Sequence, residues 1–116
     1  MSYTLFLDDI RFPDDVRYDY GPYKDIIICR NVDDAIWTLQ HRGVPSFISF
    51  DHDLGDDDPV VEATGYTFAR LLCGYIMDLN LVLPDKFGYY VHSMNPVGAR
   101  NIQSYMDNFV KHWRLQ

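Results

Sequence analysis

Four short apolar runs along the chain have the composition of β-strands. They span residues 3–7 (YTLFL), 26–29 (IIIC), 47–50 (FISF) and 89–91 (YYV). Aromatic and β-branched residues dominate these runs, and turn or polar residues bound each of them, as is typical of strands. The runs are almost continuously apolar, which indicates a sheet that is covered on both faces, as parallel sheets are.

Helical patterns separate most of these runs. Asn31 is a candidate N-cap for a helix that Gly43 ends, and apolar residues recur three and four positions apart between them. Thr64 is placed to cap a second helix. The Asn-Pro pair at 95–96 is placed to begin a third, because proline is favoured at the first helical position.

The predicted order is strand, irregular segment, strand, helix, strand, helix, strand, helix. The irregular segment, residues 11–25, has two Pro, one Gly and no helical period, so we expect an ordered loop over the sheet edge. Alternating strands and helices imply right-handed βαβ crossovers. This order predicts a three-layer α/β fold with a mostly parallel sheet of about four strands and flanking helices. A length of 116 residues predicts a single domain over residues 1–116.

Composition narrows the function classes. No apolar run approaches the ~20 residues of a membrane-spanning helix, and the first residues lack the features of a signal peptide. We therefore expect a cytoplasmic protein that contacts no membrane. The formal net charge is −7 and the cations form no cluster, which argues against binding of long duplex nucleic acid. Cys29 and Cys73 lie far apart in apolar segments, and we expect buried free thiols.

Polar residues follow three of the four predicted strands. The clusters are Asp8-Asp9, then Asp51-His52-Asp53, then His92-Ser93 with Asn95. Since ligands of an open parallel sheet bind outside the carboxyl ends of the strands, we expect these clusters to converge on one site.

Carboxylates that converge in this way repel one another unless a cation offsets their charge. A hard divalent cation does so, and Mg²⁺ is the cofactor that we expect. Mn²⁺ is an alternative, because His residues lie at the same edge. The predicted metal ligands are Asp8, Asp9, Asp51 and Asp53.

The same edge carries groups suited to phosphate chemistry. His52 and His92 are predicted to transfer protons, since an unperturbed imidazole titrates near neutrality, and with Asp51 they form the predicted catalytic set. Arginine forks and the free N–H groups at a helix N-terminus bind phosphate. The predicted phosphate-binding residues are Arg11, Ser93, Asn95 and Arg100.

These residues are similar to those of a response-regulator receiver domain. Asp8-Asp9, Asp51 and Ser93 resemble its acid pair, its phosphoacceptor Asp and its Ser/Thr. The chain departs from that pattern, because no helix is predicted between the first two strands and neither a fifth strand nor the Lys after it is found. A phosphoaccepting receiver is therefore the functional hypothesis that the sequence favours least.

A second resemblance extends from about residue 5 to residue 102. The strings LDDIRFP, FDHDLG, TGY and VHSMNPVGARNI, in this order, resemble the cyclic-phosphate-processing receiver-like family, small proteins common in phages and bacteria. The resemblance implies a receiver-like (flavodoxin-like) fold whose acidic pocket has gained His residues. It also implies an activity on nucleotides or RNA ends that bear cyclic phosphates.

The predicted function is that of a metal-dependent phosphoesterase, a hydrolase that opens a cyclic phosphate. Its expected ligand is a small nucleotide or an RNA end, in the cytoplasm of a bacterium or of a phage-infected host. The alternative is a non-catalytic receiver-like module that binds a cyclic nucleotide or a protein partner. A phage-borne sponge against a nucleotide-based host defence would be one example.

Overall fold

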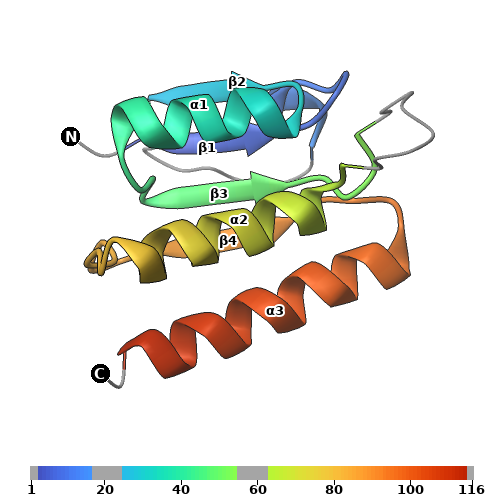
Figure 1. The fold of residues 1–116 in the computed structure, drawn as a ribbon. Helices are drawn as coiled ribbons and strands as arrows, with labels where there is room; N and C mark the ends of the chain where they lie inside the picture. The colour runs from blue at the N-terminus through green and yellow to red at the C-terminus, as the bar shows by residue number, and fades with distance from the viewer. Residues whose placement is uncertain (1–2, 17–24, 55–62, 115–116) are drawn as a thin grey trace.

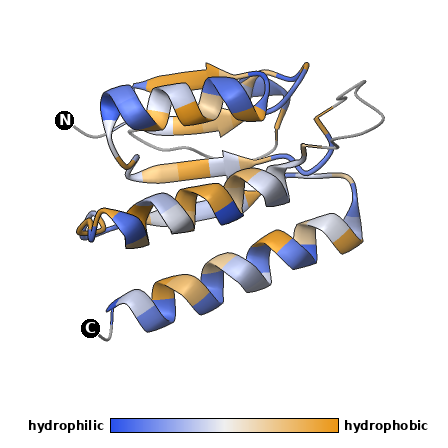
Figure 2. Ribbon diagram, in the orientation of Figure 1, coloured by the Kyte–Doolittle hydropathy of each residue, from blue (hydrophilic) through white to orange (hydrophobic). Residues whose placement is uncertain are grey.

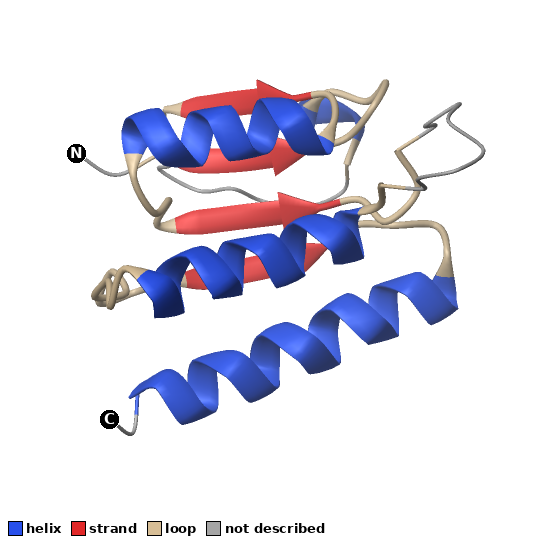
Figure 3. Ribbon diagram, viewed as in Figure 1, coloured by secondary structure: helices blue, strands red, loops and turns tan. Residues whose placement is uncertain are grey.

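The computed structural model describes residues 3–16, 25–54 and 63–114. Its four strands are β1 (Thr4–Leu7), β2 (Ile26–Cys29), β3 (Phe47–Phe50) and β4 (Gly88–Val91). They form one sheet in the order β2-β1-β3-β4, and every neighbouring pair is parallel (Figure 1). The four predicted strands and the parallel sheet are confirmed. All four carboxyl ends point to one side of the molecule (Figure 3).

Three α-helices accompany the sheet: α1 (Val32–Arg42), α2 (Gly65–Asp78) and α3 (Pro96–Arg114). Each predicted N-cap is confirmed by a side-chain oxygen that accepts a hydrogen bond from the backbone N–H three residues on. These bonds measure 2.8 Å for Asn31, 3.3 Å for Thr64 and 3.0 Å for Asn95. Gly43 ends α1 with a φ of 82°, a left-handed conformation that glycine adopts without steric cost.

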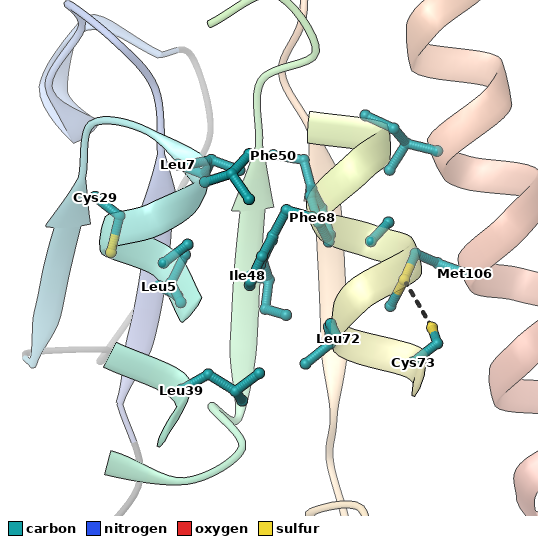
Figure 4. Close-up of a cluster of buried hydrophobic side chains, with 14 of the residues drawn as sticks. Leu5, Leu7, Cys29, Leu39, Ile48, Phe50, Phe68, Leu72, Cys73 and Met106 are labelled. Carbon is teal, nitrogen blue, oxygen red and sulfur yellow. Dashed lines mark hydrogen bonds between the residues drawn. The ribbon is translucent and has the colours of Figure 1, made fainter. Parts of the chain in front are cut away.

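The main core lies between the sheet and the helices. Leu5, Leu7, Ile48 and Phe50 alternate along β1 and β3 toward this side, where Met106 of α3 belongs to the same cluster (Figure 4). Hydrophobic and hydrophilic stretches alternate along the helices (Figure 2), which is the pattern of helices with one buried face. Both cysteines are buried free thiols, as predicted. None of the helices in the described ranges is long and apolar enough to cross a membrane.

The other face of the sheet carries a smaller cluster. Phe6 and Phe47 form its centre, and Val16, Ile26 and Tyr90 pack against it. Thus the described α-helices all contribute to the main cluster. The predicted irregular segment has a 3₁₀ turn at Pro13–Asp15, and its described part contributes Val16 to the cluster on the second face. Residues 17–24 of that segment lie outside the described residues.

Two of the polar residues at the strand ends lie on this second face of the sheet. Successive side chains of a strand point to opposite faces, so every second residue shares a face. Asp8 follows Phe6 by two positions, and Asp51 follows Phe47 by four. Backbone hydrogen bonds continue the ladder one residue past the strands, from Asp8 to Cys29 and from Asp51 to Leu7. The fold therefore turns both carboxylates toward the face opposite the helices.

Candidate functional site

The carboxyl ends of β1, β3 and β4 bring three predicted site residues together. One potential ligand atom from each of Asp8, Asp51 and His92 lies within 4.8 Å of the others. All three residues are buried, with exposed fractions of 0%, 3% and 7%. By spacing alone, this cluster could hold a metal ion.

Asp8 is surrounded by donors. Its Oδ1 accepts the backbone N–H groups of Ile10 and Arg11 at 3.0 and 2.9 Å. Its Oδ2 lies 2.9 Å from Nε2 of His92 and 3.0 Å from Nε of Arg11. Burial alone would raise the pKa of Asp8, but these hydrogen bonds and the guanidinium outweigh it and hold the pKa below its usual value. Asp8 is therefore a fixed anion.

His92 is held at both ring nitrogens. Nδ1 lies 2.7 Å from the hydroxyl of Ser49, and Nε2 faces Asp8. A neutral imidazole satisfies both contacts, because Nε2–H then donates to the carboxylate and Nδ1 accepts from the hydroxyl. The ring also stacks on Phe6 at a centroid distance of 4.9 Å. Burial lowers the pKa of His92 despite the neighbouring Asp8, which agrees with a neutral side chain that has no free nitrogen.

Asp51 has a raised pKa, unlike Asp8. Burial and the negative charge of Asp8 raise its pKa to about 6, and the charge of Asp9 adds to the effect. The positive charge of Arg11 and a hydrogen bond with Ser93 offset only part of this rise. The site therefore holds one carboxyl group that takes up a proton at mildly acidic pH.

Arg11 joins the two buried acids. Its Nε contacts Asp8, and its Nη2 lies 3.6 Å from Oδ2 of Asp51. The backbone carbonyl of Arg11 accepts a hydrogen bond from Nη1 of Arg30 at 2.6 Å, and the same nitrogen donates to the carbonyl of Asp8 at 3.2 Å. Arg30 also stacks on Phe12, 4.7 Å from the ring centroid. Arg30 therefore fixes the turn that presents Arg11.

These contacts leave little room for the predicted metal in the present arrangement. A carboxylate offers about four lone-pair positions, and those of Asp8 meet four N–H donors. His92 has no free nitrogen, and the cation between Asp8 and Asp51 is Arg11. Asp9 and Asp53, the other two predicted ligands, are not in the cluster. A metal ligated by Asp8 would require the Arg11 guanidinium to move away.

His52, the second histidine, is less buried than His92 and contacts a different carboxylate. Nδ1 of His52 lies 2.8 Å from Oδ1 of Asp53, and the two side chains are 18% and 61% exposed. The hydrogen bond with His52 lowers the pKa of Asp53, and an interaction with the Asn95 amide contributes to the shift. No hydrogen bond within the described residues engages Nε2 of His52. An imidazole oriented by a carboxylate, with a free nitrogen at a half-buried position, is suited to proton transfer.

Two glycines make room for the turn at Asp51 and His52, one beside the backbone of Asp51 and the other beside the imidazole ring of His52. A Cβ on Gly98 of α3 would lie 2.3 Å from Cγ of His52, and one on Gly65 of α2 would lie 1.9 Å from the carbonyl oxygen of Asp51. Gly65 N–H also donates to the carbonyl of His52 at 2.9 Å. Both helix N-termini therefore approach this turn as closely as only glycine allows.

The remaining predicted residues differ in their distance from the cluster. Ser93 is half-buried, interacts with Asp51, and accepts a hydrogen bond from the backbone N–H of Asn95 at 3.1 Å. Asp9 is half-buried and close enough for its charge to act on Asp51. Arg100 is exposed on α3 and makes no hydrogen bond or ion pair with any described residue.

Two residues of the site, Arg30 and Ser49, are not among those predicted from the sequence. Arg30 stands directly after β2, at the same sheet edge as the other clusters, but its neighbour Asn31 was assigned only to helix capping. Ser49 is a polar residue within the buried strand β3. A polar side chain inside such a strand needs a hydrogen-bond partner, and that requirement was the available signal.

Comparison with solved structures supports the fold. Three solved chains match, among them a fusion protein containing the trimeric coiled coil of yeast Spc42, amino acids 181–211. The match has a TM-score of 0.54 and 16% sequence identity, and it covers 98% of this chain and 80% of the other. At this identity the likeness concerns the fold alone.

Comparison of the amino-acid sequence with known proteins and family models identifies the family of the chain. Among curated proteins, none gives a significant match. A model of one protein family, described as the cyclic-phosphate processing receiver domain, matches residues 3–108, which include all four described strands and most of α3. The chain therefore belongs to the cyclic-phosphate processing receiver domain family.

Proposed function

We propose that this protein hydrolyses a cyclic phosphate of a nucleotide or an RNA end. The observation that carries the proposal is the partly exposed His52–Asp53 pair, with its 2.8 Å hydrogen bond, at the sheet edge where Arg11 is also partly exposed. One group is suited to moving protons and the other to binding a phosphate, and both are accessible. The family description supplies the class of substrate.

In the proposed reaction, water attacks the phosphorus atom and one ester P–O bond of the ring breaks. His52 accepts a proton from the attacking water at Nε2 and returns it to the leaving oxygen, so the product is a phosphate monoester with a free hydroxyl. Asp53 accepts the hydrogen bond from Nδ1–H and stabilises the imidazolium that forms in between.

The phosphoryl oxygens are held by donors that do not take part in proton transfer. Arg11 uses Nε and Nη2 for the two carboxylates, and within the described residues no contact engages its Nη1. Those N–H groups and the Ser93 hydroxyl stabilise the negative charge that grows on the phosphate. The predicted Mg²⁺ or Mn²⁺ would supply charge neutralisation at the same place, after displacement of Arg11.

A second candidate function is binding without turnover. It is favoured by one observation, the burial of His92, because one of the two predicted proton-transfer groups then has no access to substrate. The same arginine and hydroxyl would hold a cyclic nucleotide that remains intact.

A phosphorus NMR time course on a panel of cyclic-phosphate nucleotides tests the two candidates. We expect ring opening by the wild type and its loss in His52→Gln, while His41→Gln, a substitution on the exposed side of α1, retains it. Parallel samples contain Mg²⁺, Mn²⁺ or chelator. Unchanged resonances with saturable line broadening would instead establish the binding module. Equal turnover by His52→Gln and wild type would contradict the assignment of His52.

A further inference from the structure

The acidic site already contains a cation of its own. Asp8 and Asp51 are buried carboxylates at neighbouring strand ends, and the Arg11 guanidinium contacts both, at 3.0 and 3.6 Å. Buried like charges are costly unless a positive charge lies between them. In this protein the side chain of Arg11 supplies that charge.

Arg11 is held in this position by its own backbone and by a second arginine. Its N–H donates to Asp8 Oδ1 at 2.9 Å, and its carbonyl accepts from Arg30 at 2.6 Å. The Arg11 side chain is 28% exposed, and within the described residues no hydrogen bond or ion pair engages its Nη1. A planar fork that is fixed on one edge and open on the other is well suited to a phosphate group, which it binds through paired N–H donors.

We infer that Arg11 is the resident cation of this acidic site, taking the place of a divalent metal, and that the phosphate of the ligand binds against its guanidinium. Asp8 is then a positioning residue for Arg11 and not a metal ligand. The identity of the ligand rests on the proposed function, whereas the exclusion of metal by Arg11 is independent of it.

The inference is tested first by metal binding. Mn²⁺ is the probe, and its free concentration is followed by electron paramagnetic resonance. We expect weak binding to the wild type and an affinity increase of about tenfold or more in Arg11→Met, because a positive charge is removed and lone pairs of Asp8 and Asp51 become free. Arg70→Met is the matched control, since it removes the same charge from an exposed position of α2 that makes no hydrogen bond or ion pair with a described residue.

Arg11→Lys separates the loss of the cation from damage to the fold. Lysine retains the positive charge between the carboxylates but lacks the planar fork. This variant should continue to exclude Mn²⁺ while binding phosphate less well than the wild type. Circular dichroism of all variants establishes that they are folded.

The second arm measures binding of 2′,3′-cyclic AMP by isothermal titration calorimetry in the presence of EDTA, with His52→Gln in every protein so that the nucleotide stays intact. We expect binding to be unaffected by the chelator and to fall about tenfold or more when Arg11→Met is added, in line with the loss of a bidentate charged contact. Tight Mn²⁺ binding by the wild type, lost in Asp51→Asn and not increased in Arg11→Met, would overturn the inference.

The two proposals can fail separately. Turnover that requires added metal leaves the hydrolytic function standing and overturns the role of Arg11. Enhanced Mn²⁺ binding by Arg11→Met, without turnover of any cyclic phosphate by the wild type, supports the role of Arg11 and removes the hydrolytic function.

Discussion

Two histidine–carboxylate pairs lie at the same sheet edge and differ in burial and in the ring nitrogen that contacts the carboxylate. The nitrogen–oxygen distance is 2.9 Å between His92 and Asp8 and 2.8 Å between His52 and Asp53. The side chains of the first pair are 1% and 0% exposed, and those of the second are 18% and 61% exposed. Nearly equal nitrogen–oxygen distances therefore occur in two very different environments, through Nε2 in the first pair and through Nδ1 in the second.

The difference shows what each pair can contribute. In the buried pair every nitrogen and oxygen of the side chains has a partner, so the pair holds β1 and β4 together and fixes Asp8 for Arg11. In the second pair, no hydrogen bond within the described residues engages Nε2 of His52. We interpret the first pair as a positioning element and the second as the proton-transfer element.

The largest expected effect comes from the buried pair. Asp8→Asn replaces an ionised acceptor by an amide that cannot satisfy all the donors around it, so we expect the free energy of unfolding to fall by about 3–5 kcal/mol. Asp53→Asn is the matched change in the exposed pair, and a loss below about 1 kcal/mol is expected. Urea denaturation at pH 7 measures both. Similar losses in the two variants would show that burial does not distinguish the pairs.

The next effect concerns Asp51, which follows β3, the strand that lies between β1 and β4 in the sheet. Its pKa is raised from 3.8 to about 6 on folding, so the folded state loses stability as pH rises through this interval. Asp51→Asn removes the ionisation and should stabilise the protein at pH 8 by up to about 3 kcal/mol. The gain should shrink toward zero near pH 4. Urea denaturation as a function of pH, in EDTA, measures it; a variant no more stable than wild type at pH 8 would contradict the raised pKa.

A smaller effect, on activity alone, is expected in the exposed pair. His52→Gln should lower kcat by about 100-fold or more, because the proton-transfer group is lost. Its stability should change by less than about 0.5 kcal/mol. His92→Gln should instead lower the free energy of unfolding by about 2 kcal/mol, since Asp8 and Ser49 lose a buried partner. Steady-state kinetics and urea denaturation of both variants test this; loss of stability in His52→Gln would assign a structural role to both histidines.

The smallest effect tests whether the position of His52 matters. A methyl group on Gly98 would collide with the imidazole ring, so Gly98→Ala should displace His52 and lower kcat about tenfold. Gly74→Ala is the control, because a Cβ on Gly74 in α2 meets no atom within 4 Å and alanine favours helix. Comparable kcat values for the two alanine variants would show that the contact of Gly98 with His52 is dispensable.

The elements of this fold could be predicted because their signals are local. Each strand is a short apolar run, and each helix begins at a residue whose side chain caps the N–H three positions later. The meeting of Asp8, Asp51 and His92 was also predictable, because parallel strands bring their carboxyl ends to one edge. These properties follow from spacing along the chain and from the pairing rule of parallel sheets.

The role of each residue in the site depends on how deeply its side chain is buried, and the positions of residues along the chain do not reveal this. Both histidines follow a strand, yet His92, two positions after Tyr90, stacks on Phe6, while His52 lies on a turn against Gly98. Arg11 and Arg30 are ordinary loop cations in the sequence, and only the folded turn brings them to the carboxylates and carbonyls that they contact.

The sequence by itself determined the parallel sheet, the positions at which the three helices begin and the edge at which the polar groups gather. Only the tertiary structure decided which histidine is accessible and that Arg11 provides the positive charge between the acids. The physical reason is that burial and hydrogen-bond satisfaction depend on contacts between residues far apart in the chain. Asp8 and His92, for example, are 84 positions apart but share a hydrogen bond.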